Sequence, residues 1–147
     1  MNSNIKAFNE LSTDELYQIL RLRNEVFVVE QACVYQDCDN KDLKSMHLFY
    51  KDKGTIVAGV RIVPKGISYD EVSIGRVVTN HKYRRDGLGS EMMKKAIAFI
   101  EDEWNETVIR ISAQEYLLTF YQNLGFEIVS DCYLEDNIPH VEMLYVK

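Results

Sequence analysis

The spacing of apolar residues changes several times along this chain, and each change marks a predicted element. Apolar side chains that recur every three or four positions indicate a helix, whereas β-branched runs and alternation indicate strands. The predicted elements are a strand at 5–8, a helix at 13–28, a hairpin of strands at 47–51 and 55–63, a strand at 72–79, a helix at 87–104, a strand at 107–112, a helix at 115–124, and strands at 126–129 and 141–146. Residues 30–45 are expected to form a long loop with at most a short helix. This order predicts an α/β or α+β protein with helices on the faces of a sheet.

The start of the first predicted helix carries a capping signal. Ser12 precedes Glu15 by three positions, which is the spacing of a capping box. Leu11 and Leu16 flank this box at the spacing of a hydrophobic staple. The helix is therefore expected to begin directly after Ser12.

Size and charge limit the class of protein. The length of 147 residues fits one domain, and no repeat or Gly/Ser-rich linker divides residues 1–147. The formal net charge of -6 argues against a nucleic-acid partner, because nucleic-acid binders usually present a basic surface. No apolar run is long enough to cross a bilayer, and the first residues lack a signal-peptide pattern. A single cytoplasmic domain without a membrane partner is expected.

The clearest chemistry lies where a predicted strand joins a predicted helix. A basic turn containing Arg84 and Arg85 leads through Gly87 and Gly89 into the helix. The first amides of a helix lack backbone partners and lie at the positive end of its dipole, so this turn has the ingredients of a phosphate site. The P-loop pattern is absent, and Met92 occupies the third glycine position of the dinucleotide fingerprint. The alternative is an ordinary helix start with solvated arginines.

Two motifs resemble those of the GNAT superfamily of N-acetyltransferases. Residues 84–89 are similar to its R/Q-x-x-G-x-G/A motif, and residues 120–126 resemble its second signature, a helix ending in Tyr-x-x-x-Gly-Phe. The resemblance implies a mixed, mostly antiparallel central sheet of about six to seven strands flanked by helices. It also implies acetyl-CoA as cosubstrate, with the strand at 75–79 holding the pantetheine arm. The implied cosubstrate-binding residues are Val77, Val78, Thr79, Arg84, Arg85, Asp86, Gly87, Leu88, Gly89, Ser90, Gln114 and Tyr121.

Further segments resemble the ElaA branch of that superfamily. They are residues 23–31, Cys33, Tyr35, Asp37, Asp39, His47 and the run 138–140. Two positions depart from the expected pattern. Val34 stands where the branch commonly has proline, and Gln114 stands where many superfamily members have an asparagine facing the pantetheine.

Two catalytic tasks follow from the resemblance. Tyr121 occupies the superfamily's tyrosine position, which implies that it protonates the departing coenzyme A thiolate. The alternative is a core tyrosine on a helix. A backbone amide near Val78 would stabilise the oxyanion if the strand splays there, and Gly75 is compatible with such a distortion.

The general base has several candidates. They are Glu30, Glu71, His140 and Glu142. Glu30 follows the apolar run 26–29, so burial would raise its pKa toward a useful value; an exposed carboxylate at a helix end is the alternative. An imidazole can act as a base near pH 7, so His140 is either a base or a loop histidine after Pro139. An ordered water is the remaining option.

The resemblance implies an N-acetyltransferase that moves an acetyl group from acetyl-CoA to a primary amine of a small molecule or peptide, by direct transfer in a ternary complex. One alternative is a regulatory module that binds acetyl-CoA or another acyl-CoA without turnover. A second is an acyl-homoserine-lactone synthase, which the acetyl-CoA turn disfavours. A homodimer paired through sheet edges is compatible with the sequence.

Other polar residues suggest no further cofactor. Asp37, Asp39 and Asp42 lack the glycine and distal glutamate of a calcium loop. They are expected to form a solvated acidic loop that attracts a cationic acceptor. The histidines and cysteines show no ligand spacing, so no metal is expected.

Overall fold

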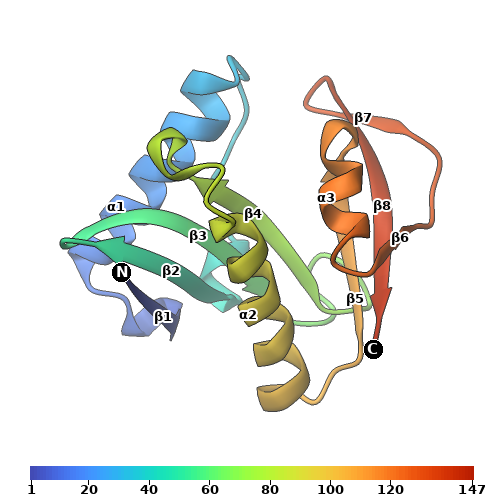
Figure 1. Ribbon diagram of the computed structural model, residues 1–147, viewed down its shortest axis with the longest axis horizontal. Coiled ribbons are helices and arrows are strands. Elements are labelled where there is room, and N and C mark those ends of the chain that lie inside the picture. Colours follow the sequence, from blue (N-terminus) through green and yellow to red (C-terminus); the bar gives the residue numbers. More distant parts are fainter.

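The computed structural model describes all residues from 1 to 147, and its eight strands form two sheets that diverge from each other (Figure 1). The first sheet has the order β1-β2-β3-β4, and the second has the order β5-β8-β6 with β7 also paired to β8. All of these strand pairs are antiparallel. The strands are β1 (Asn2–Ala7), β2 (Met46–Asp52), β3 (Thr55–Val63), β4 (Ser73–Thr79), β5 (Val108–Gln114), β6 (Phe126–Ile128), β7 (Tyr133–Glu135) and β8 (Ile138–Val146).

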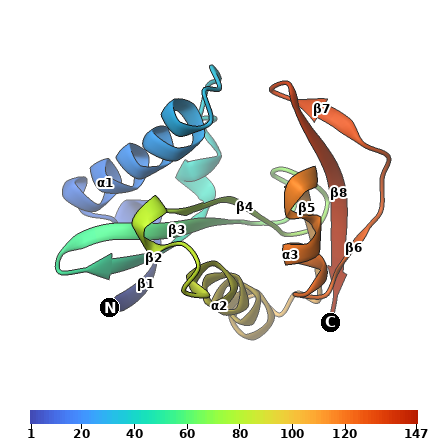
Figure 2. The same ribbon diagram turned by 45° about the horizontal axis from the view of Figure 1, so that its top comes forward.

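Three α-helices cover the sheets, namely α1 (Thr13–Arg23), α2 (Leu88–Glu103) and α3 (Leu118–Gln122). In β2, Leu48 and Tyr50 belong to the core cluster that contains α2, whereas Phe49 belongs to the cluster that contains α1. Successive side chains of a strand point to opposite faces, so α1 and α2 cover opposite faces of the first sheet (Figure 2). In the second sheet, Tyr121 of α3 packs edge-to-face on Phe126 of β6. The predicted mixed fold with helices on its faces is confirmed. None of the helices combines the length and apolar character needed to span a membrane.

The first helix begins as predicted but ends differently. The Ser12 hydroxyl accepts the Glu15 amide at 3.0 Å, and Glu15 Oε1 accepts the Ser12 amide at 2.9 Å, which completes the capping box. The α-helical geometry ends at Arg23, and a π-helical turn continues over Asn24–Glu30. A π-helical turn widens the backbone locally and is common at functional sites. Periodicity predicted the helical course but could not reveal this change of winding.

The two sheets separate between β4 and β5. One parallel bridge joins Val72 to Ile109, and the Arg110 amide donates to the Val72 carbonyl at 2.9 Å. Beyond this bridge, the outer edge of β4 has no strand neighbour. Its outward-facing amides and carbonyls therefore face the space between the sheets.

The middle of β4 is bulged. Gly75 pairs with Arg61 and Val78 pairs with Gly59, so two residues of β4 lie opposite one residue of β3. Arg76 lies in this bulge with a φ of 50°, which is rare for a residue with a side chain. The distortion expected near Gly75 is present, one residue further along the strand.

The short strand β7 was absent from the predicted elements. Its three residues pair only with the beginning of β8, and Tyr133 lies opposite His140. A strand of this length carries too little periodicity to be seen in the sequence. It adds to the second sheet three residues that the predicted elements did not include.

Candidate active site

A cleft of ≈ 690 Å³ opens where β4 and β5 separate. Its walls come from β4, the turn before α2, β5, α3 and the β7–β8 turn, with the end of the π-helical turn at its rim. This volume lies within the range of small-molecule sites. The lining includes the predicted residues Glu30, His140, Val77, Val78, Thr79, Arg84, Arg85, Gly87, Leu88, Gly89, Ser90, Gln114 and Tyr121. Asp86 is exposed and lies outside this lining.

The turn before α2 has the backbone geometry of an anion site. Arg85 and Gly87 both have positive φ values, 79° and 74°, so the chain reverses sharply before the helix begins. Gly87 is the N-cap, and no side chain caps the first amides of α2. These amides point out of the helix end, where an anion can accept them. A side chain on Gly87 would be strained at this φ, which explains the glycine.

The two arginines of this turn have different environments. Arg84 forms a bidentate ion pair with Glu30, with contacts of 2.6 and 3.2 Å, and its Nε donates to the Thr79 carbonyl at 3.1 Å. Arg85 is exposed beside the same helix start. Arg85 therefore supplies the more accessible positive charge for a phosphate.

Of the two alternatives for Glu30, the structure shows the exposed carboxylate. Its side chain is 41% exposed, because the π-helical turn carries it to the rim of the cleft. The Arg84 hydrogen bond holds the pKa of Glu30 below its usual range. A lowered pKa makes a carboxylate a weaker base, so the physical argument for Glu30 as general base is lost.

Two other candidate bases lie outside the cleft lining. Glu71 and Glu142 each form an ion pair with Arg110 at 3.0 Å. The hydrogen bond from Arg110 lowers the pKa of Glu71. Both carboxylates are therefore structural partners of an arginine in the second sheet.

Tyr121 is buried and lines the cleft. Its ring packs edge-to-face against Phe120 and Phe126, with centroid distances of 5.1 and 6.0 Å. Burial, with a smaller contribution from Tyr116, raises the pKa of Tyr121 to about 12. The hydroxyl therefore stays protonated at neutral pH and is available as a proton donor.

His140 lies in β8, opposite Gln114 of β5, and its side chain is only 7% exposed. Its Nδ1 lies 2.7 Å from the Ile138 carbonyl oxygen. A carbonyl only accepts, so Nδ1 carries the proton and Nε2 of the neutral ring has a free lone pair. Nε2 lies 3.4 Å from Glu135 Oε2. The structure therefore places a histidine of suitable tautomer in the wall of the cleft.

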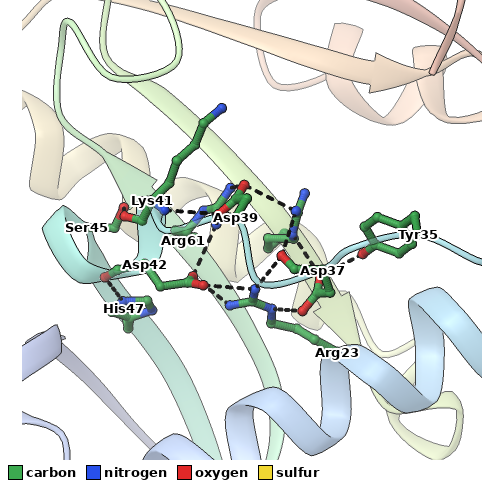
Figure 3. Close-up of polar contacts among 10 residues, drawn as sticks. Arg23, Tyr35, Asp37, Asp39, Lys41, Asp42, Ser45, His47 and Arg61 are labelled. Atoms are coloured by element: carbon green, nitrogen blue, oxygen red, sulfur yellow. Dashed lines mark hydrogen bonds and ion pairs between the residues drawn. The ribbon is translucent and has the colours of Figure 1, made fainter. Parts of the chain in front are cut away.

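The acidic loop is bound by arginines rather than solvated, as Figure 3 shows. Arg23 contacts Asp37 at 2.9 Å and Asp42 at 2.8 Å. Arg61 contacts Asp39 at 2.7 Å and Asp42 at 3.1 Å. Burial raises the pKa of Asp39, but Arg61 outweighs this effect and brings the pKa to about 2. The expectation of a solvated loop that attracts a cationic acceptor is wrong, because these charges are already neutralised.

Arg76 connects this network to the cleft. Its guanidinium contacts Asp37 at 2.9 Å and Asp39 at 3.3 Å, and it lies over the Tyr35 ring at 5.5 Å. The same residue forms the bulge of β4 and lines the cleft. The sequence pattern did not predict this role of Arg76. The network itself left one signal in the sequence, which is Arg61 inside an otherwise apolar strand, because a buried arginine requires carboxylate partners.

The diverging sheets, the turn with uncapped amides before α2 and the cleft lined by Tyr121 agree with the acyltransferase fold that the sequence motifs implied. The Acetyltransferase (GNAT) domain family matches residues 9–147, and the chain belongs to this family of acetyltransferases.

Within the family, the chain is similar to ElaA proteins, as the sequence predicted. It is 38% identical to Protein ElaA of Escherichia coli over 137 residues, covering 92% of this chain and 90% of that protein. The crystal structure of Escherichia coli ElaA superposes with a TM-score of 0.92 and covers 99% of both chains. A Pseudomonas aeruginosa acyl-CoA N-acyltransferase has a TM-score of 0.93 at 38% identity, covering 99% of this chain and 100% of that one. A UPF0039 protein of Schizosaccharomyces pombe is 43% identical over 140 residues, covering 94% of this chain and 92% of that protein.

Proposed function

We propose that the protein transfers an acetyl group from acetyl-CoA to a primary amine by direct transfer in a ternary complex. One observation carries the proposal: a single cleft contains an anion-binding helix start, the unpaired edge of β4 and the protonated Tyr121. These features match the three parts of a thioester cosubstrate, which are its phosphates, its pantetheine amides and its sulfur.

The cosubstrate is proposed to lie along β4 and the start of α2. Its pyrophosphate accepts the amides of residues 87–90 and the charge of Arg85. The pantetheine amides pair with the open edge of β4, as an added strand would. The thioester carbonyl then lies at the bulge, where a backbone amide near Val78 on the open edge of β4 stabilises negative charge on its oxygen, and Gln114 faces it from β5.

The proposed reaction balances within this cleft. The nitrogen lone pair of the acceptor attacks the thioester carbon, so a C–N bond forms and the C–S bond breaks. The proton lost by the amine goes to His140 Nε2, whose tautomer leaves a lone pair available. Tyr121 donates its proton to the leaving thiolate.

The direct test measures thiol release from acetyl-CoA with a panel of primary amines, beside coenzyme A binding by calorimetry. We expect binding and amine-dependent thiol release. Binding without release for any amine would identify a module that only holds the cosubstrate, and absence of binding would overturn the assigned cleft.

Replacing Tyr121 with phenylalanine tests the proton donor. The Tyr121→Phe variant should lose about a hundredfold in kcat, because the thiolate must then leave without a positioned acid. Coenzyme A affinity should be unchanged in calorimetry. Tyr17→Phe, at an exposed position on α1, is the matched control. Unchanged turnover in the Tyr121 variant would remove this residue from the mechanism.

A further inference from the structure

We infer that Glu135 and His140 bind the ammonium group of the acceptor, and that the acceptor is an alkylammonium ion without a carboxylate beside its nitrogen. This inference rests on the proposed function and concerns the end of the cleft that β7 and β8 line. Both residues line the cleft, from β7 and β8 respectively.

The geometry presents two hydrogen-bond acceptors to each other. Nδ1 of His140 donates to the Ile138 carbonyl, so Nε2 of the neutral ring offers only a lone pair. Glu135 Oε2 lies 3.4 Å from this nitrogen. Either a proton on Nε2 or an external donor satisfies such a pair, and an ammonium group carries three N–H donors on one atom. Such a group can bind Glu135 and His140 at the same time.

Neighbouring side chains hold both acceptors in place. Ser112 of β5 donates to Glu135 Oε1 at 3.3 Å and also hydrogen-bonds the Tyr133 hydroxyl. The Tyr133 ring stacks on the His140 ring, with centroids 6.1 Å apart. The site is therefore built from three strands of the second sheet.

Charge balance indicates what this end of the cleft binds. Glu30 at the rim is paired with Arg84, whereas Glu135 has no lysine or arginine partner, and its side chain is 50% exposed. Asp136 follows it at the same mouth of the cleft and is also exposed. Uncompensated carboxylates attract an ammonium ion and repel a carboxylate. An α-amino acid would bring its carboxylate toward these residues, whereas an alkylamine would not.

The same arrangement prepares the amine for attack. One N–H of the bound ammonium faces Nε2, and that proton passes through Nε2 to solvent, which leaves a lone pair on the nitrogen. The proton that the nitrogen loses during the attack then goes to Nε2 and leaves an imidazolium on His140. Glu135 then pairs with this imidazolium at the observed separation. The other titratable groups in this region are Tyr69, Tyr133 and Glu142. Arg110 neutralises the charge of Glu142 through an ion pair.

Nuclear magnetic resonance of the histidine rings tests the site without turnover. Before butylamine is added, His140 should carry its proton on Nδ1. With saturating coenzyme A at about pH 8, butylamine should then shift the His140 ring resonances. Glu135→Gln should abolish the butylamine-induced shift, and the exposed Glu127→Gln on β6 should retain it. A doubly protonated free ring, or an equal shift in the Glu135 variant, would overturn the inference.

Kinetics with matched amines test the acceptor class. Butylamine should have a higher kcat/KM than norvaline, which is the same chain with a carboxylate beside the nitrogen. Glu135→Gln should lower kcat/KM for butylamine about tenfold, mainly through KM, while the uncharged methoxyamine changes by less than about twofold. Equal losses for both amines, or a preference for norvaline, would contradict the ammonium site.

A protein that binds butylamine at His140 but releases no thiol would refute the proposed function and leave this site standing.

Discussion

Glu15 shows how one side chain serves two purposes. It completes the capping box of α1, and it also forms ion pairs with Lys6 at 3.1 Å and Lys51 at 3.2 Å. Burial raises the pKa of Glu15, but the Ser12 amide and the two lysines outweigh this effect and bring the pKa to about 2. The cap was visible in the sequence, whereas the lysines come from β1 and β2 and were not.

The lowered pKa predicts acid sensitivity. Because the folded pKa of about 2 lies below the ordinary value of 4.5, Glu15 stabilises the protein above pH 4.5, and this contribution is lost as the pH falls toward 2. At neutral pH the contribution is about 3 kcal/mol. In urea unfolding, the free energy of unfolding of Glu15→Gln should lie well below that of wild type near neutral pH. The gap should be smaller at about pH 3.

The control for this experiment is Glu103→Gln, at an exposed position near the end of α2. It should follow the wild-type pH dependence of the unfolding free energy. If wild type and Glu15→Gln differed in unfolding free energy by the same amount at neutral pH and at about pH 3, the assigned pKa would be contradicted.

At the scale of elements, the loop 31–45 is held by buried charge rather than by apolar packing. Arg23 of α1 and Arg61 of β3 converge on Asp42, which is itself buried (Figure 3). A buried ion pair contributes little over an apolar alternative, but removing one partner leaves an uncompensated charge. The network thus fixes the position of the loop beside the bulge of β4.

Asp42→Ala should therefore lower the free energy of unfolding by about 3–5 kcal/mol, measured by urea denaturation. Asp102→Ala, at an exposed position on α2, should change it by less than about 0.5 kcal/mol. A loss for Asp42→Ala as small as that of the control would show that the aspartate is not an essential partner of the two arginines.

At the scale of the whole molecule, the cleft exists because the two sheets diverge after a single bridge at Val72. A ligand that binds only the folded protein stabilises it by RT ln(1 + L/Kd), where L is the free ligand concentration, so the stabilisation grows with the logarithm of that concentration. This gives the binding proposal a readout that does not depend on turnover.

Coenzyme A at about 100 times its Kd should stabilise the fold by about 2.7 kcal/mol and raise Tm by about 5–10 °C. Gly89→Glu should abolish the shift, because it places bulk and negative charge at the anion site. Gly89→Ala should retain it, since an added Cβ meets only Phe120 at an ordinary 3.6 Å. A full Tm shift in the Gly89→Glu variant would contradict the assigned phosphate turn.

Short-range signals explain what could be predicted. The capping box at Ser12, the glycines of the phosphate turn and the helix carrying Tyr121 depend on residues close together in the chain. The environment of Glu30 stayed undecided, because an apolar run does not reveal which way a π-helical turn directs its last side chain. Glu135 was missed because its strand is only three residues long.

The sequence by itself determined the order of most elements, the glycine-containing turn before α2 and the family of the protein, since each depends on local spacing. Only the tertiary structure decided which charges meet. Arg76 reaches Asp37, and Glu135 faces His140, because strand register and the divergence of the sheets bring them together. Electrostatic pairing acts through space, so it depends on distances that spacing along the chain does not contain.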